Sequence, residues 1–241
     1  MRINRIYLPE AQHNGQITPL PESAFGHLVR VLRQREGDGF EVFNGKGLRF
    51  KAELTDVGKK QASARLVESL DALPESPLHT HLGLVMSKGD RFDYALQKAT
   101  ELGVSTITPL DSDRCDLRLK ADRQEKKLQH WQGVITSACE QCGRDTLPEL
   151  NPITPLLDWL NQDSAALKLV LHTSATAPAW PEQRPERVRF LVGPEGGLTD
   201  TEVTTAMQQS YQAWQLGPRI FRTETAPVAM LALLQHRWGD L

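Results

Sequence analysis

The chain has 241 residues, of which 39% are hydrophobic and 24% charged, and its formal net charge is −2. This composition is typical of an ordinary globular protein with room for one large domain or for a medium and a small one. No stretch approaches the roughly 20 consecutive apolar residues of a membrane span, and the N-terminus lacks a signal peptide's apolar segment. We therefore expect a cytoplasmic protein without a membrane partner, whose nearly balanced charge neither requires nor excludes nucleic acid.

The cysteines are Cys115, Cys139 and Cys142. An odd, low count argues against a disulfide framework. Cys139 and Cys142 form a single CxxC in a segment that reads as helical, and without a second pair of ligands this spacing makes a poor zinc site. We therefore expect no metal.

Residues 1–72 predict short strands separated by turns. Strands are expected at residues 2–8, 39–44, 49–54 and 61–67. Asn44-Gly45 is a strong hairpin-turn signal, and residues 27–33 predict one short helix. Several closely spaced strands favour a small β-barrel. The two prolines of residues 73–77 indicate a linker at the start of a second domain, residues 73–241.

Strands and helices alternate from about residue 78 onward. Strands are expected at residues 79–86, 104–110, 167–173, 188–192 and 213–216. Helices are expected at residues 90–102, 121–143 and 226–238, and Thr199 with Glu202 forms a capping box for one more helix. This alternation predicts an α/β domain with a mostly parallel sheet.

The loop Gly193-Pro-Glu-Gly-Gly197 joins a predicted strand to a predicted helix. Ligands of open α/β sheets bind at such positions, and glycine lets backbone approach a ligand closely. A phosphate site is disfavoured, because the Lys-Ser/Thr of a Walker loop is missing and Glu195 would repel a phosphate. Taken alone, this loop reads as an ordinary tight turn.

A second loop of the same kind runs through residues 216–225, and it is too polar for a simple connector. Two alternatives to a ligand site stay open at this point. Thr223 or Thr225 can serve as the N-cap of the last helix, and Arg222 can pair with Glu224.

The two loops together resemble the motif pair of the RsmE family, the ribosomal RNA uridine-N3 methyltransferases of the SPOUT superfamily. Residues 88–91, 97–103, 140–144 and the N-terminal residues 1–7 fit further family motifs, so that the resemblance covers nearly the whole chain. One departure is Phe221, which stands where an aliphatic residue is common.

The resemblance implies a C-terminal SPOUT α/β trefoil-knot domain and an N-terminal PUA-like β-barrel that binds RNA. It also implies the cofactor S-adenosylmethionine, a homodimer, and 16S ribosomal RNA or the small ribosomal subunit as substrate. The implied cofactor-binding residues are Leu171, His172, Thr173, Gly193, Pro194, Glu195, Gly196, Gly197, Leu216, Gly217, Ile220, Arg222 and Thr223.

Uracil N3 is a poor nucleophile until its proton leaves, so this reaction needs a base, or a cation that stabilises the developing anion. We expect Arg144 and Arg222 as cations, with Glu140 and Glu224 as bases or as groups that orient the arginines. In the barrel, the residues expected to contact RNA phosphates or bases are Arg2, Arg5, Tyr7, Arg30, Arg33 and Arg35.

Three rival functions are less well supported. Ribose 2′-O methylation would favour an Asn-rich strand end, where this chain has Arg222-Thr-Glu-Thr225. A non-catalytic RNA-binding or ribosome-assembly factor would not need an intact cofactor pocket. A nucleotide-binding regulatory domain would need the phosphate signature that is missing here.

Overall fold

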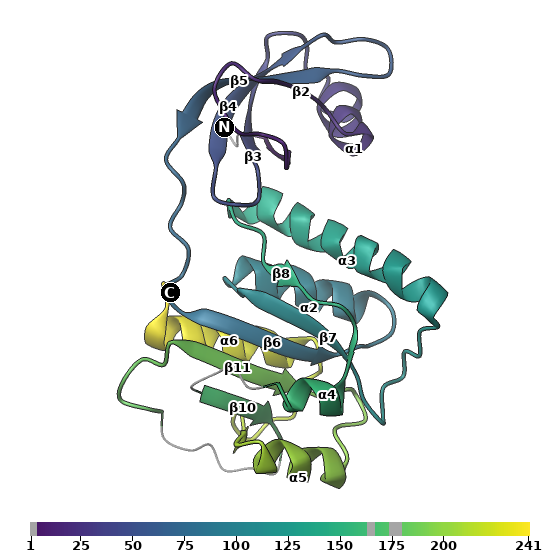
Figure 1. Ribbon diagram of the computed structural model, residues 1–241, viewed down its shortest axis with the longest axis vertical. Helices are drawn as coiled ribbons and strands as arrows, with labels where there is room; N and C mark the ends of the chain where they lie inside the picture. Colours follow the sequence, from purple (N-terminus) through teal and green to yellow (C-terminus); the bar gives the residue numbers. More distant parts are fainter. Residues whose placement is uncertain (1–3, 163–166, 174–179) are drawn as a thin grey trace. The chain divides into compact units, whose positions relative to one another are not determined.

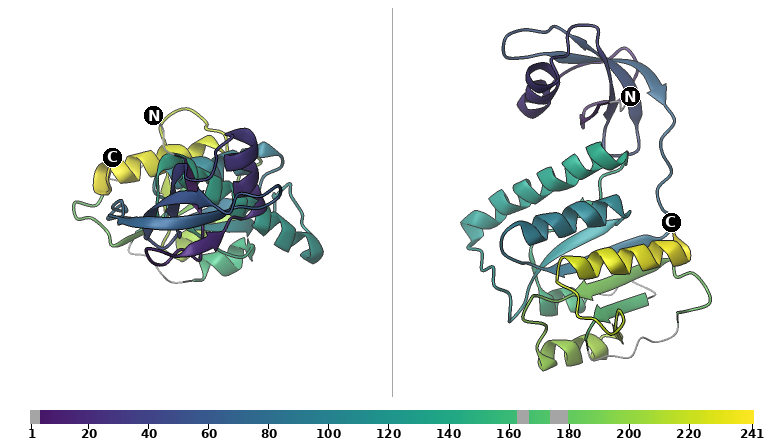
Figure 2. Two further views of the ribbon diagram at one scale, coloured as in Figure 1. Left: turned by 90° about the horizontal axis from the view of Figure 1, so that it is seen from above. Right: turned by 180° about the vertical axis from the view of Figure 1, so that it is seen from behind.

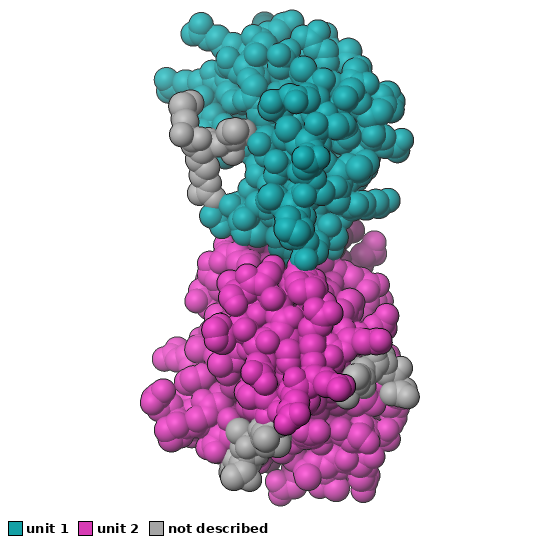
Figure 3. Space-filling view, turned by 90° about the vertical axis from the view of Figure 1, so that its left-hand side faces the viewer, with its two compact units in different colours: residues 1–75, 139–147 teal, residues 76–138, 148–241 magenta. Residues whose placement is uncertain are grey.

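The computed structural model describes residues 4–162, 167–173 and 180–241. The chain forms two compact units (Figure 3). Unit 1 consists of Met1–Glu75 and Cys139–Leu147, and unit 2 consists of Ser76–Ala138 and Pro148–Leu241. None of the helices that the structure describes is long and apolar enough to cross a membrane.

Unit 1 is built on a five-stranded sheet, ordered β1-β3-β4-β5-β2 (Figure 1). Its strands are β1 (Arg5–Tyr7), β2 (Ile17–Pro19), β3 (Gly39–Phe43), β4 (Arg49–Thr55) and β5 (Ser63–Leu70). The pairing of β1 with β3 is parallel, and the other described pairings are antiparallel. The predicted hairpin turn joins β3 to β4, and Asn44 Oδ1 accepts the backbone N–H groups of Lys46 and Leu48. The short strand β2 was not predicted.

Two helical segments follow β2, and they differ from the predicted helix at residues 27–33. Helix α1 (Glu22–Phe25) continues directly into the π-helical turn η1 (Gly26–Val31). The helix therefore begins earlier than expected and ends before Arg33, whose φ of 56° is left-handed and incompatible with continuation. Leu28 is fully buried in the core of unit 1.

The segment Cys139–Leu147 packs with unit 1 although it is distant in sequence. Arg5 Nη2 lies 2.6 Å from Asp145 Oδ1, and the Asp145 side chain is only 1% exposed. The second carboxylate oxygen of Asp145 accepts the N–H of Leu73 at 2.9 Å. A buried carboxylate is stable only when it is paired in this way. Asp145 thus ties three separate pieces of chain together.

Unit 2 contains a seven-stranded sheet in the order β12-β10-β11-β6-β7-β8, with β9 also pairing with β7. The strands are β6 (His79–Val85), β7 (Thr106–Asp111), β8 (Glu149–Leu150), β9 (Thr154–Pro155), β10 (Leu167–Leu171), β11 (Arg187–Val192) and β12 (Gln212–Trp214). Every described pairing in it is parallel. The predicted parallel α/β arrangement is confirmed.

Helices cover both faces of this sheet. Helices α2 (Asp90–Glu101) and α6 (Thr225–Trp238) lie together on one face, in front of the sheet in the right-hand view of Figure 2. Helix α4 (Leu156–Leu160) covers the opposite face, and α5 (Asp200–Gln208) packs beside it. The long helix α3 (Ala121–Cys142) begins in unit 2, and its last residues belong to unit 1.

The α4 face is held by a buried group of polar and aromatic side chains. The Trp159 ring lies directly over Gly83 of β6, where a methyl group would come within 2.5 Å of it. The Arg189 guanidinium is 3.7 Å from the centre of that ring, and it donates to the carbonyl oxygens of Trp159 and Gln162. Arg189 is fully buried. It therefore attaches the C-terminal end of α4, where helix carbonyls favour a cation, to the middle of the sheet.

His81 of β6 belongs to the same buried group and gives unit 2 a defined acid sensitivity. Burial, with the charges of Arg189 and His79, lowers the pKa of His81 to about 3. The unfolded histidine takes up a proton below about pH 6.5. Between these values the unfolded state binds more protons, so this contribution to stability is complete above pH 6.5 and is lost as the pH falls.

We therefore expect the His81→Gln variant to lose less stability on acidification than the wild type. Between pH 7 and 4.5 the difference should be on the order of 2–3 kcal/mol. Urea unfolding of both proteins at the two pH values measures it, and the comparison cancels the carboxylates that titrate in the same range. Equal losses in the two proteins would contradict the assignment.

The predicted capping box at the start of α5 is present. Thr199 Oγ1 accepts the Glu202 N–H, and Glu202 Oε2 accepts the Thr199 N–H at 2.7 Å. The other oxygen of Glu202 accepts the N–H of Asp113, in the segment after β7, at 2.9 Å. The Glu202 side chain thus fixes both the start of α5 and a loop from another part of the sheet.

Candidate active site

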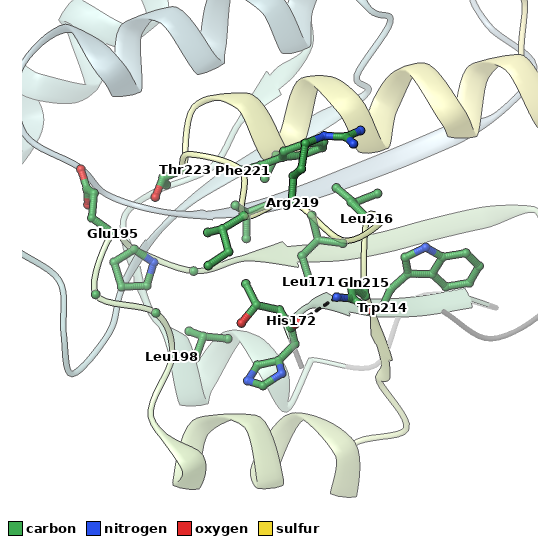
Figure 4. Close-up of a pocket in the computed structure, with 18 of the residues that line it drawn as sticks. Leu171, His172, Glu195, Leu198, Trp214, Gln215, Leu216, Arg219, Phe221 and Thr223 are labelled. Atoms are coloured by element: carbon green, nitrogen blue, oxygen red, sulfur yellow. Dashed lines mark hydrogen bonds between the residues drawn. The ribbon is translucent and has the colours of Figure 1, made fainter. Parts of the chain in front are cut away.

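A cavity of unit 2 lies at the carboxyl ends of the neighbouring strands β12, β10 and β11 (Figure 4). Its volume is about 470 Å³, within the range of small-molecule sites, about 300–1,000 Å³. Three loops form its walls: residues 171–173 after β10, 192–198 after β11, and 214–221 after β12. All of the predicted cofactor residues except Arg222 line it.

Backbone and side-chain hydrogen bonds fix these loops. The His172 N–H donates to Trp214 O at 3.0 Å. Gln215 Nε2 donates to Thr173 O at 2.9 Å (Figure 4). In the β11 loop, the Gly197 N–H donates to Pro194 O, and Gly197 has a φ of 70° that favours glycine. These bonds hold the three loops in place around the cavity.

Several lining residues were not predicted from the sequence. They are Arg114, Val192, Leu198, Asp200, Trp214, Gln215 and Ala226, whereas Pro218, Arg219 and Phe221, which also line it, belong to the second predicted loop. Arg114 is the most distant in sequence, and its Nη1 donates to Gly196 O at 3.0 Å. Its position just after β7, at the carboxyl edge of the sheet, is the signal that would have identified it.

A second, smaller hollow adjoins the first. Its volume is about 330 Å³, and its lining residues are Arg91, Glu195, Ile220, Phe221, Arg222, Thr223 and Glu224. It shares Glu195, Ile220, Phe221 and Thr223 with the larger cavity. The Arg222 side chain is 78% exposed, and its guanidinium lies 4.0 Å from the Glu224 carboxylate. Arg222 thus belongs to the smaller hollow and not to the cofactor cavity predicted for it.

The start of α6 differs from the capping expected of Thr223 or Thr225. The N-cap of α6 is Glu224, and no side-chain hydrogen bond caps the helix. Thr223 is buried in the wall that the two cavities share. Neither threonine is therefore the N-cap of α6, so helix capping does not explain why this loop is polar.

Comparison with known proteins gives the family. Residues 74–235 match the model of an RNA methyltransferase domain, and residues 20–67 match that of an RNA methyltransferase PUA domain. A ribosomal RNA small subunit methyltransferase E from Buchnera aphidicola is 36% identical over 100% of this chain and 98% of its own length. The chain belongs to the ribosomal RNA small subunit methyltransferase E family.

Two solved structures agree with this assignment. A methyltransferase from Legionella pneumophila, in complex with its cofactor S-adenosylmethionine, is 39% identical with a TM-score of 0.95. A ribosomal RNA small subunit methyltransferase E from Neisseria gonorrhoeae, bound to S-adenosylmethionine, is 39% identical with a TM-score of 0.91. Both alignments cover 100% of each chain. They confirm the predicted SPOUT α/β-knot fold with a PUA-like N-terminal barrel.

Two of the four predicted catalytic residues of this chain, Glu140 and Arg144, belong to unit 1. Arg144 Nη2 lies 2.6 Å from Glu75 Oε2, and Glu140 Oε1 accepts the Tyr7 N–H at 3.1 Å. Burial raises the pKa of Glu140, although the Tyr7 hydrogen bond opposes this shift. The other two, Arg222 and Glu224, belong to unit 2. The idea that all four act at one centre stays a prediction.

The predicted RNA-binding residues of this chain fall into two groups within unit 1. Arg5 is paired with Asp145, and Tyr7 packs against Phe43 with ring centres 5.6 Å apart. The exposed group is Arg30, Arg33 and Arg35. Arg2 lies outside the described residues. Because they are exposed, Arg30, Arg33 and Arg35 are the better candidates for contacts with RNA phosphates.

The cysteines have no described metal partners. Among the residues that the structure describes, no group of three or more His, Cys, Asp or Glu side chains is placed to hold a metal ion. Cys139 is fully buried, and burial raises the pKa of its thiol to about 12. A thiol that stays protonated is a poor ligand and a poor nucleophile.

Proposed function

We propose that this chain is an S-adenosylmethionine-dependent methyltransferase that methylates N3 of a uridine in 16S ribosomal RNA. The observation that carries the proposal is the cavity at the ends of β12, β10 and β11, together with the family of the chain. Two relatives of the same length and fold are solved with S-adenosylmethionine bound. The proposed cofactor supplies a cationic, already activated methyl group.

The residues of the cavity suit a flat, largely uncharged adenosine. The glycines of residues 193–197 and 216–217 let backbone approach a ligand closely, and Leu171, Leu198 and Leu216 provide apolar surface. Glu195 faces the cationic group of Arg91 at 2.9 Å. The Lys-Ser/Thr of a phosphate-binding loop is missing, so a sulfonium cofactor with no phosphate fits this set better than a nucleotide does.

The acceptor requires loss of the proton on uracil N3. Arg222 and Glu224 line the hollow that adjoins the cofactor cavity. We propose that Arg222 stabilises the developing anion on O2 or O4 and that Glu224 accepts the proton. We also propose that the enzyme acts as a homodimer and works in the cytoplasm, where 16S ribosomal RNA is found.

The test combines binding with product mapping. Purified protein is titrated calorimetrically with S-adenosylhomocysteine, with ATP and NAD as controls, and then incubated with S-adenosylmethionine and small ribosomal subunits from cells that lack the protein. We expect selective binding of S-adenosylhomocysteine and new N3-methyluridine in 16S ribosomal RNA. Absence of binding in folded protein would refute the methyltransferase proposal and favour a non-catalytic RNA-binding factor.

The barrel is proposed to bind RNA through its exposed arginines. We expect simultaneous replacement of Arg30, Arg33 and Arg35 by alanine to weaken binding of 16S ribosomal RNA roughly tenfold or more and to flatten its salt dependence, because fewer counterions are released. The affinity for S-adenosylhomocysteine should not change. Point substitutions are preferable to deletion of residues 1–72, because deletion would leave the buried Asp145 without Arg5.

A matched control for this variant lies on the same unit. Lys51 and Arg65 are exposed cations that pair with Glu68 and Glu53 at 2.6 and 2.9 Å. Replacing both by alanine should change RNA binding little. Equal effects of the two sets of substitutions would show a non-specific response to charge and would refute the assignment of the three arginines.

A further inference from the structure

The smaller hollow of unit 2 combines exposed apolar side chains with arginines. Ile220 is 82% exposed, which is unusual for a large aliphatic side chain, and Phe221 next to it is half-buried. Arg91 and Arg222 line the same hollow, with side chains 51% and 78% exposed. Apolar and aromatic side chains can pack against an unstacked base, and guanidinium groups bind phosphate. This combination of side chains is therefore suited to binding a nucleotide.

The position of Arg91 is costly for the helix that carries it. Arg91 lies in the first turn of α2, where the positive end of the helix dipole disfavours a cation. Glu195, from the loop after β11, compensates for this cost, because its Oε1 accepts from Arg91 Nη1 at 2.9 Å. This bond joins positions 104 residues apart in the sequence. It fixes the guanidinium at the boundary that Glu195 forms between the two cavities.

Arg91 also has the chemistry to bind a second group. A guanidinium carries five N–H donors in a planar fork, and Nη1 is the nitrogen that donates to Glu195. A carboxylate on one edge orients the fork without neutralising its ability to donate from another. Half of the side chain is open to solvent. Arg91 is thus a fixed, accessible cation beside the proposed cofactor site.

We propose that this smaller hollow is the acceptor subsite, which receives the target uridine, and that Arg91 positions it by binding an adjacent phosphate. Ile220 and Phe221, which line both cavities, contact the base and bring it to the boundary with the cofactor. Methyl transfer requires the donor and the acceptor to be held a few ångströms apart, and shared walls provide this proximity. The inference rests on the proposed function, and it adds the surface that contacts the base and a positioning residue for the adjacent phosphate.

The test is the Arg91→Ala variant, assayed with small ribosomal subunits that lack the methyl group. We expect the KM for the subunit to rise about tenfold, because a charge-assisted contact is lost. The slope of log affinity against log salt concentration should fall by about 0.7–0.9, the value for one phosphate contact. The kcat and the affinity for S-adenosylhomocysteine should stay within about twofold of the wild type.

The control variant is Lys98→Ala. Lys98 lies on the same helix and is also paired with a carboxylate, Glu101, at 2.8 Å, but it lines neither cavity. It should leave KM, kcat and the salt slope unchanged. Glu195→Gln, which removes the charge that orients Arg91, should raise KM for the subunit while the salt slope stays that of the wild type.

The possible results separate this inference from the function on which it rests. Parallel loss of S-adenosylhomocysteine affinity in Arg91→Ala would show that the ion pair only shapes the cofactor loop, and would overturn the subsite. An unchanged KM and salt slope would overturn it as well. Wild-type protein that binds S-adenosylhomocysteine but methylates no ribosomal RNA, or that binds none, would instead refute the proposed function and the subsite with it.

Discussion

Replacing Gly83 by alanine is expected to destabilise unit 2 by about 3 kcal/mol, at the upper end of the range for overpacking a core. The added methyl group would lie 2.5 and 2.6 Å from Cη2 and Cζ2 of Trp159. Neither partner can move easily, because Gly83 is on the buried strand β6 and Trp159 is fully buried. The ring is also held by Arg189. Chemical denaturation, followed through the unfolding of unit 2, measures the loss.

Two companion variants make this expectation specific. Gly133 lies within α3 and has no atom within 4 Å of the position where a Cβ would stand. Gly133→Ala should therefore stabilise the helix by roughly 0.5–1 kcal/mol. Trp159→Ala alone should cost about 3–5 kcal/mol. In its presence, Gly83→Ala should become nearly neutral, and a loss that simply adds to that of Trp159→Ala would disprove the proposed clash.

Replacing Arg222 by alanine is expected to lower methylation about 10²–10³-fold, the usual loss when one preorganised donor to a developing anion is removed. The fold should survive, because the side chain is 78% exposed. Binding of S-adenosylhomocysteine should change little, since Arg222 does not line the larger cavity. Single-turnover methylation and calorimetry together measure the two quantities.

The Arg222→Lys variant serves as its matched control. Lysine keeps the positive charge and loses the planar fork, so it should recover part of the lost rate. Turnover equal to that of the wild type in Arg222→Ala would remove Arg222 from the mechanism. Equal losses in rate and in cofactor affinity would assign it to cofactor binding, as the sequence alone predicted.

The sequence predicted which loops line the cavity where the signal is local. A glycine-rich loop after a strand and before a helix places backbone at the carboxyl edge of a parallel sheet, and residues 193–197 and 216–217 line the cavity. The family and fold predictions, which rest on the same motifs, are confirmed. Short elements without periodicity were missed: β2, β8, β9 and α4 have two to five residues each, too few to show a repeat.

Contacts between distant residues could not be predicted. Arg5 reads as a surface cation, yet its partner Asp145 is 140 positions away and nearly fully buried. Glu195 reads as a charge out of place in a ligand loop until Arg91 is found beside it. The grouping of Glu140 and Arg144 with unit 1 has the same origin. For Arg5, Glu195 and Arg144 the sequence shows the charge, and only the three-dimensional structure supplies its counter-charge. Glu140 instead accepts the N–H of Tyr7.

Glu202 lines neither described cavity, yet it couples two distant segments of unit 2. Its two carboxylate oxygens accept the backbone N–H groups of Thr199 and Asp113 from opposite sides, and the side chain is only 3% exposed. Glutamine would present an amide N–H₂ to one of these donors, and aspartate is one methylene too short to span them. A substitution here would therefore disturb two segments at once, the start of α5 and the loop after β7, without altering a residue that lines either described cavity.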